Sequence, residues 1–289
     1  MSRLLPFACA ILLFISGNAA AQKLKVAPPG TIHLKDNLYI DKIPVSNNSY
    51  KEFLYSIEQF WSEKTHANIA DLPMYGLQFT ETGEEDNMRV SFTNKNGSFV
   101  FDTSNLQPDE SFYQRMKIPD YLVVDLATNL TMEYYSKAMA YKNNPVVYVT
   151  HEQAEMFCKW RSDMVMLHYS VASGGKGERK KYYSKITYRL MTEDEWKYAY
   201  NNKGQLLLSD FGIRTDFNKK ALASNIAVDS RRKEASINIY ANNFAELLLE
   251  KKSMIGVLWN NTNQISQNII TNSYAPASNV GFRCICEVE

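Results

Sequence analysis

The sequence predicts a protein of the α+β class, in which short strands and two or three main helices are connected by much irregular chain. Apolar residues at helical spacing indicate one helix that starts near residues 46–48. Two more helices are indicated by capping pairs at their N-termini, Thr150 with Gln153 and Thr192 with Glu195. Short alternating stretches predict strands before and between the helices. From residue 201 onward asparagine-rich turns dominate, which predicts irregular structure.

The first predicted helix follows an alternating stretch that Pro44 ends, because proline cannot donate to a sheet. Its apolar positions lie three or four residues apart, which places them on one face. They are Tyr50, Phe53, Leu54, Ile57 and Phe60. We expect this face to be buried.

The second predicted helix follows a short β run that opens at Pro145. Several residues of the helix lie along one side, which we expect to pack on the core. They are Ala154, Phe157, Cys158, Arg161 and Val165.

The stretch "YRLMTEDEWKYAY" (residues 188–200) predicts a short strand followed by the third helix. Trp196 and Tyr200 are four residues apart, so both are expected to face the core. The acidic residues 193–195 suit a helix N-terminus through the helix dipole. We interpret them as structural and not as catalytic acids.

Residues 22–289 are predicted to form a single domain with a long insertion at about residues 62–140. An "NKNGS" turn between two alternating runs predicts a hairpin in this insertion, as part of a small sheet of its own. The basic, glycine-bearing stretch 173–181 predicts a solvated surface loop. On exposure and composition, the insertion and this loop are the candidate binding face.

The N-terminus predicts export. Residues 1–21 combine Arg3, a short apolar run and small residues at the end, the pattern of a secretory signal peptide. The alternative is a short N-terminal anchor. No later stretch is predicted to span a membrane. We expect a periplasmic, outer-membrane-associated or extracellular protein, either soluble or held to the envelope by a partner.

The composition adds little about partners. The chain has 289 residues, of which 45% are hydrophobic and 22% charged, as in ordinary globular proteins. The net charge of +1 argues against nucleic acid as a partner, although charge can still gather locally. Cys158, Cys284 and Cys286 remain after the leader, and in an oxidising compartment two of them can pair. One thiol is then left over.

Four segments, in order along the chain, resemble the formylglycine-generating enzyme (sulfatase-modifying factor) family. They are "IDKIPVSNNSYKEF" (40–53), "PVVYVTHEQAEMFCKW" (145–160), "YRLMTEDEWKYAY" (188–200) and "NVGFRC" (279–284). The resemblance implies a C-type-lectin-like fold and a disulfide between Cys158 and Cys284, with Cys286 as the free thiol. Strand alternation puts Cys284 and Cys286 on the same face, so the two could exchange roles.

The resemblance also shows what this chain lacks. In the enzymes, two cysteines after an "RGGSW" element bind copper(I) and activate oxygen, because thiolates suit this soft ion. Only Gly256 and Trp259 of that element remain here, and residues 254–279 contain no cysteine. Copper-dependent oxidation of a peptidyl cysteine is therefore not expected, and the chain is predicted to be a pseudoenzyme.

Other metal sites of the family are weak or missing in the sequence. The related iron-dependent sulfoxide synthases use closely spaced histidines, whereas His33, His66, His151 and His168 lie far apart. We interpret His151, at the start of a helix, as a structural imidazole. A calcium site is implied weakly by residues that match two family positions, and no other cofactor is expected. These residues are Asn243 and Glu246 at one site and Asn225 and Ile226 at another.

Three functions follow as hypotheses. The first is a non-catalytic exported scaffold or binding module of the bacterial cell envelope with protein partners. The insertion and "EQAEMFCKWR" (152–161) resemble envelope lipoproteins of the Bacteroidota gliding-motility and type IX secretion machinery, although a lipid-attachment cysteine is missing. The second is a formylglycine-generating-like oxidoreductase with rearranged cysteines. The third is a lectin-like binder of glycan or peptide through tyrosine- and asparagine-rich loops.

Overall fold

The structure of the protein is a computed structural model that describes most of the chain. The described residues are 25–84, 89–119, 122–125, 132–207, 214–215, 221–223, 237–240, 244–251, 253–257 and 280–289. The predicted signal peptide lies outside them. The described chain combines helices with several small sheets, which confirms the α+β class.

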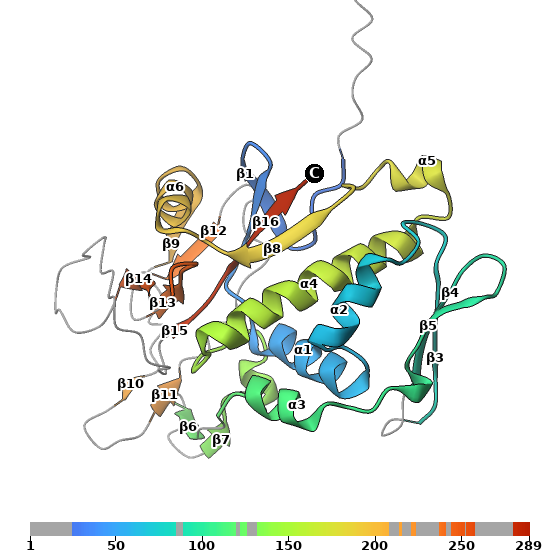
Figure 1. Cartoon of the computed structure of the whole chain (residues 1–289). Helices are drawn as coiled ribbons and strands as arrows, with labels where there is room; N and C mark the ends of the chain where they lie inside the picture. Colours follow the sequence, from blue (N-terminus) through green and yellow to red (C-terminus); the bar gives the residue numbers. More distant parts are fainter. Residues whose placement is uncertain are drawn as a thin grey trace, which may run out of the picture.

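The central sheet is antiparallel and has the strand order β1-β2-β16-β8. Its strands are β1 (Thr31–Lys35), β2 (Leu38–Asp41), β8 (Ile186–Leu190) and β16 (Cys284–Val288). The sheet joins the N-terminal part of the described chain to its C-terminal end (Figure 1). Helix α4 (His151–Ala172) packs on β8 from one side, and α6 (Glu193–Lys203) covers the other side.

Four further α-helices and two short 3-10 helices accompany α4 and α6 in the described chain. They are α1 (Asn47–Gln59), α2 (Glu63–Ala70), η1 (Thr103–Asn105), α3 (Glu110–Met116), η2 (Met139–Tyr141) and α5 (Lys176–Arg179). Helices α1 and α2 both pack against α4 (Figure 1).

Four smaller sheets complete the described elements. One contains β3 (Gln78–Thr82), β4 (Arg89–Thr93) and β5 (Phe99–Asp102), and a second contains β6 (Leu122–Asp125), β7 (Met132–Tyr134), β10 (Arg214–Thr215) and β11 (Ala221–Ala223). The third pairs β9 (Gly204–Leu207) with β12 (Ile237–Tyr240), and the fourth joins β13 (Phe244–Leu247), β14 (Met254–Val257) and β15 (Val280–Gly281).

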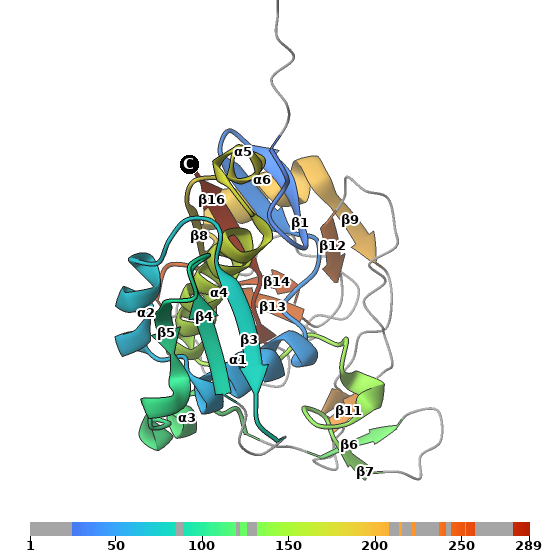
Figure 2. The ribbon, with the colours of Figure 1, turned by 90° about the vertical axis from the view of Figure 1, so that its right-hand side faces the viewer.

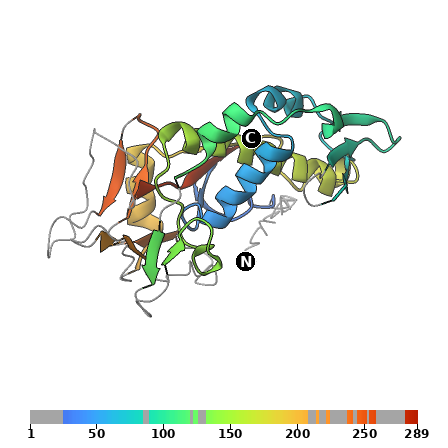
Figure 3. The ribbon, with the colours of Figure 1, turned by 90° about the horizontal axis from the view of Figure 1, so that it is seen from below.

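The sheet β3-β4-β5 confirms that a small sheet forms within residues 62–140, the stretch predicted to be an insertion. The predicted hairpin is the β4-β5 pair, whose turn closes with the Asn94 N–H donating to the Ser98 carbonyl at 3.1 Å. Gly97 takes a φ of 80° in this turn, a left-handed value that favours glycine. Figure 2 shows this sheet facing the viewer, and Figure 3 shows it at one end of the molecule.

All three predicted helices form, and both predicted capping boxes are present. Ser46 caps α1, and both Thr150 with Gln153 and Thr192 with Glu195 form complete capping boxes. The apolar faces of α1 and α4 meet in an aromatic core. Phe53 and Phe157, whose ring centroids lie 5.7 Å apart, are at its centre.

The junction between β8 and α6 is held by a side-chain fork. Arg189 donates from Nη1 and Nη2 to the two carboxylate oxygens of Glu195, each at 2.8 Å. Burial opposes ionisation of Glu195, but the hydrogen bonds from Arg189 and from the Thr192 N–H hold its pKa below the usual value. The structural interpretation of this acidic residue therefore agrees with the geometry.

Two local predictions are wrong. The run after Pro145 is not a strand, because only Pro145 itself forms an isolated bridge, to Ser46, and Tyr148 turns the chain with a φ of 61°. The apolar run instead reflects complete burial of Val146 and Val147 in irregular chain. The stretch 173–181 is not wholly solvated, because Arg179 is buried and donates to the carbonyls of Met74, Tyr183 and Ser184.

Within the described chain, no helix combines the length and the apolar character that crossing a lipid bilayer requires.

Candidate functional site

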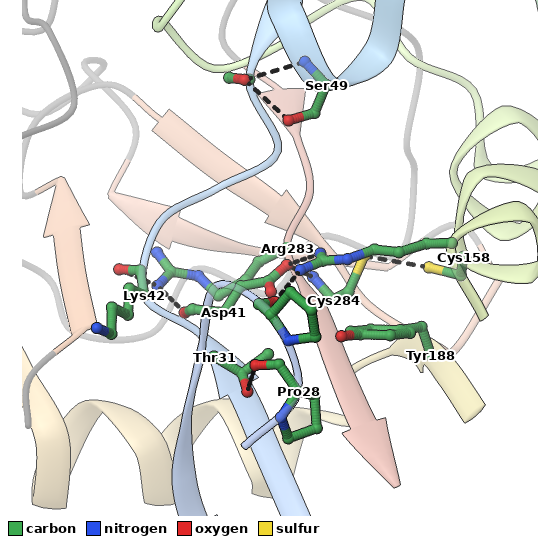
Figure 4. Close-up of polar contacts among 12 residues, drawn as sticks. Pro28, Thr31, Asp41, Lys42, Ser49, Cys158, Tyr188, Arg283 and Cys284 are labelled. Atoms are coloured by element: carbon green, nitrogen blue, oxygen red, sulfur yellow. Dashed lines mark hydrogen bonds and ion pairs between the residues drawn. The ribbon is translucent and has the colours of Figure 1, made fainter. Parts of the chain in front are cut away.

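The predicted cysteines meet where α4 crosses β16 (Figure 4). Cys158 comes from α4 and Cys284 from the start of β16, and their sulfurs lie 3.4 Å apart as thiols. Both side chains are buried. The fold thus brings together the pair that the family resemblance implied. Oxidation of this pair to a disulfide stays a prediction.

Cys286 lies on the same face of β16 as Cys284. Both pack in the core toward α4, whereas Ile285 between them packs on the opposite side of the sheet, in the same cluster as Trp196. The shared face expected from strand alternation is therefore confirmed. The Sγ contact of Cys158 in this structure is with Cys284.

The environment of Cys158 and of Cys286 favours the protonated thiol. Burial raises the pKa of Cys286 to about 12, and the charge of Asp41 adds to the shift. Burial and the contact with Cys284 raise the pKa of Cys158 well above its ordinary value. Because the thiolate is the reactive form, neither group is a ready nucleophile or copper ligand at neutral pH.

A charged pair lies beside the cysteines. Arg161 of α4 donates from Nη1 to Oδ2 of Asp41 at 2.6 Å, and its guanidinium lies over the ring of Tyr188, 4.3 Å from the ring centroid. The same carboxylate oxygen accepts the N–H of Cys284 at 3.2 Å. This contact fixes the start of β16 relative to β2 and α4, so its role is structural.

Glu246 and Arg283 form a buried ion pair at the other end of the site. Their side chains are 6% and 1% exposed, and Arg283 Nη2 lies 2.8 Å from Glu246 Oε1. Trp196 donates from Nε1 to Glu246 Oε2 at 3.0 Å. Arg283 also donates from Nη1 to the carbonyl of Asp41 at 3.0 Å. Both oxygens of Glu246 are thus engaged by a cation and an indole.

Glu246 is the only one of the four predicted calcium residues that the structure describes. Asn225, Ile226 and Asn243 lie outside the described residues. Among the side chains that the structure does describe, no group of three or more His, Cys, Asp and Glu residues could hold a metal ion. The calcium site stays a prediction.

His151 agrees with its structural interpretation. It is partly buried at the first turn of α4, and its Nε2 lies 2.5 Å from the carbonyl oxygen of Leu248, to which it donates. The imidazole therefore ties α4 to the chain that follows β13.

Sequence reasoning missed a second polar cluster, formed by Trp61, His66 and Asp163. Trp61 donates from Nε1 to Asp163 Oδ2 at 2.7 Å, and His66 Nδ1 lies 2.8 Å from the same oxygen. A signal was present, because Asp163 stands between Trp160 and Leu167 at helical spacing on an otherwise apolar stripe. Such a carboxylate must be partnered when it is buried.

The predicted disulfide can be tested by counting thiols. In exported protein unfolded without reductant, we expect one free thiol in the wild type, two in Cys158→Ala and none in Cys286→Ala. Cys158→Ala should also reduce the free energy of unfolding by about 2–5 kcal/mol, because it opens the bridge. Three free thiols in the wild type would contradict the pairing.

Comparison with known proteins gives one match, to a protein-family model. The model of the sulfatase-modifying factor enzyme 1-like domain matches residues 12–257, which is most of the chain. The match ends before Cys284 and Cys286, so their roles rest on the residues and contacts described above. No curated protein and no solved structure matches the chain significantly.

Proposed function

Because the chain belongs to the sulfatase-modifying factor enzyme 1-like family, we propose that it is a non-catalytic member that serves as an exported scaffold or binding module of the bacterial cell envelope. The observation that carries the proposal is the state of its cysteines. Residues 254–279 contain none, the three described cysteines are buried, and burial raises the pKa of Cys158 and of Cys286. A fold can keep its structural framework while its site loses the reactive groups.

The same observation weighs against an oxidoreductase with rearranged cysteines. Such an enzyme needs a thiolate that substrate and copper can reach. Cys284 and Cys286 are each 0% exposed, and Cys286 is held in its thiol form by burial.

The surface that we propose for partner binding is the insertion patch, defined as Met74, Tyr75, Phe79 and Phe99. These four large apolar residues are 43% to 68% exposed, and all lie between residues 74 and 99. Strand β3 is an edge strand whose five residues are all exposed. An exposed edge can pair with a strand of another protein. We therefore propose that the partner is a protein of the cell envelope.

The finer setting that we propose is an assembly of the gliding-motility or type IX secretion type. Its support is the sequence resemblance of residues 152–161 and the position of the insertion. In such an assembly the insertion patch would contact a neighbouring subunit, which would hold the chain at the envelope.

The test is quantitative affinity capture from the envelope of the source organism, followed by mass spectrometry. The wild type is expected to capture a partner in stoichiometric amount, and the double variant Phe79→Thr with Phe99→Thr should lose it. Tyr198→Thr is the control, because Tyr198 is an exposed aromatic residue (38%) on α6, outside the patch. Secretion-ring subunits as the captured partner would support the finer setting.

Two outcomes would count against the proposal. If the wild type captures nothing in stoichiometric amount, the scaffold role fails. If the double variant captures the partner as well as Tyr198→Thr does, the insertion patch is not the contact surface.

A further inference from the structure

A hollow lies between α2, α4 and the free edge of β8. Its volume is about 480 Å³, which lies in the range of small-molecule sites. The walls are mostly apolar. The apolar side chains that line it are Ile69, Leu72, Met74, Met166, Leu167 and Ile186.

One polar group on the wall is oriented by a buried partner. Asp163, with its side chain 8% exposed, accepts hydrogen bonds from Trp61 Nε1 at 2.7 Å and from His66 Nδ1 at 2.8 Å. Because Nδ1 of His66 faces a carboxylate, this nitrogen carries a proton in either charge state of the ring. Nε2 is left for a ligand, and the side chain of His66 is 44% exposed in the lining.

The carboxylate of Asp163 does not make the hollow a cation site. Burial raises its pKa, while the hydrogen bonds from Trp61 and His66 oppose that shift. Both oxygens face His66, at 2.9 Å for Oδ1 and 2.8 Å for Oδ2, and Oδ2 also faces the indole. Asp163 thus acts as a positioning residue for the imidazole.

Two lysines add positive charge to the lining. Lys159 Nζ lies 3.5 Å from Glu63, and Lys185 Nζ lies 3.1 Å from Glu289, with all four side chains about half exposed or more. Exposed pairs of this kind contribute little to stability, so either lysine can turn to a ligand at small cost. Asp163 is the only carboxylate in the lining. The two lysines therefore offer exposed cations to a ligand, beside the carboxylates of Glu63 and Glu289 with which they pair.

We propose that this hollow binds a small amphiphilic carboxylate, such as a medium-chain fatty acid. The carboxylate accepts a hydrogen bond from Lys159 Nζ, and it accepts one from His66 Nε2 when the imidazole is protonated on both nitrogens. The aliphatic chain lies on the apolar wall formed by residues such as Ile69, Met166 and Ile186. The site shares Met74 with the insertion patch, but its head-group residues lie on α2 and α4, outside the patch. It adds a ligand to the protein and does not depend on which envelope protein the chain contacts.

The experiment is calorimetric titration of the exported full chain with decanoate, below the concentration at which decanoate forms micelles. We expect saturable binding with one site per chain and a dissociation constant in the micromolar range. Decanol and hexanoate are expected to bind at least about tenfold more weakly, because one lacks the charge and the other lacks apolar length.

Three variants localise the site. His66→Gln and Lys159→Gln should each weaken decanoate binding by about tenfold, the size of one lost charge-assisted hydrogen bond. Lys197→Gln, on α6 and outside the lining, should bind as the wild type does. Lys159 is exposed, so its variant stays informative if His66→Gln fails to fold. Absence of saturable binding, equal binding of decanol, or wild-type affinity in both His66→Gln and Lys159→Gln would overturn the proposal.

Discussion

Replacing Arg283 with methionine is expected to lower the free energy of unfolding by about 3–5 kcal/mol. The substitution would leave Glu246, whose side chain is 6% exposed, without its cation. It would also remove the hydrogen bonds that Arg283 donates to the carbonyls of Asp41 and Lys42. Chemical denaturation followed by tryptophan fluorescence measures the change.

A second substitution separates the cost of an unpaired charge from the loss of packing. The double variant Arg283→Met with Glu246→Leu should regain part of the lost stability, because no buried charge remains. Recovery is only partial, since Trp196 Nε1 loses its acceptor on Glu246. Lys197→Met is the matched control, and breaking its half-exposed contact with Glu193 should cost less than about 1 kcal/mol. If Arg283→Met lowers the free energy of unfolding by less than about 1 kcal/mol, the buried pair does not stabilise the fold as predicted.

Replacing Phe53 with alanine is expected to lower the free energy of unfolding by about 3–5 kcal/mol, because the change opens a cavity at the centre of the core. Phe53 is fully buried on α1. Its ring lies 5.7 Å from that of Trp61, 5.7 Å from that of Phe157 and 5.5 Å from that of Trp160, measured between centroids. The midpoint of denaturant-induced unfolding reports the loss.

Tyr55→Ala is the control for this substitution, because Tyr55 lies on the same helix but is 47% exposed. Tyr55→Ala should change the free energy of unfolding by no more than about 0.5 kcal/mol. Equal losses for Phe53→Ala and Tyr55→Ala would mean that α1 does not bury the face assigned to it.

The parts of the fold that were predictable from sequence are those with short-range signals. The start of α1 is encoded by Ser46 as N-cap and by apolar residues one turn apart, and α4 is encoded by the box of Thr150 with Gln153. The hairpin β4-β5 is encoded by its asparagine-glycine turn. Each signal lies within a few residues of the structure that it forms.

The parts that were missed depend on contacts between distant residues. Trp61 and Asp163 are 102 residues apart, and Glu246 and Arg283 are 37 apart, so nothing local identifies the partner. The run after Pro145 read as a strand because buried valines look alike in a strand and in buried irregular chain. The family resemblance supplied the pairing of Cys158 with Cys284, which spacing alone left open.

We propose that this family member does not carry out copper-dependent oxidation of a peptidyl cysteine. The most direct test is to incubate the exported protein with copper(I), oxygen, a reductant and a peptide that carries a single cysteine, and to follow the peptide by mass spectrometry with an aldehyde-specific probe. We expect the peptide cysteine to stay unconverted, as it does with heat-denatured protein. Accumulation of peptide aldehyde over several equivalents of the protein would contradict this proposal.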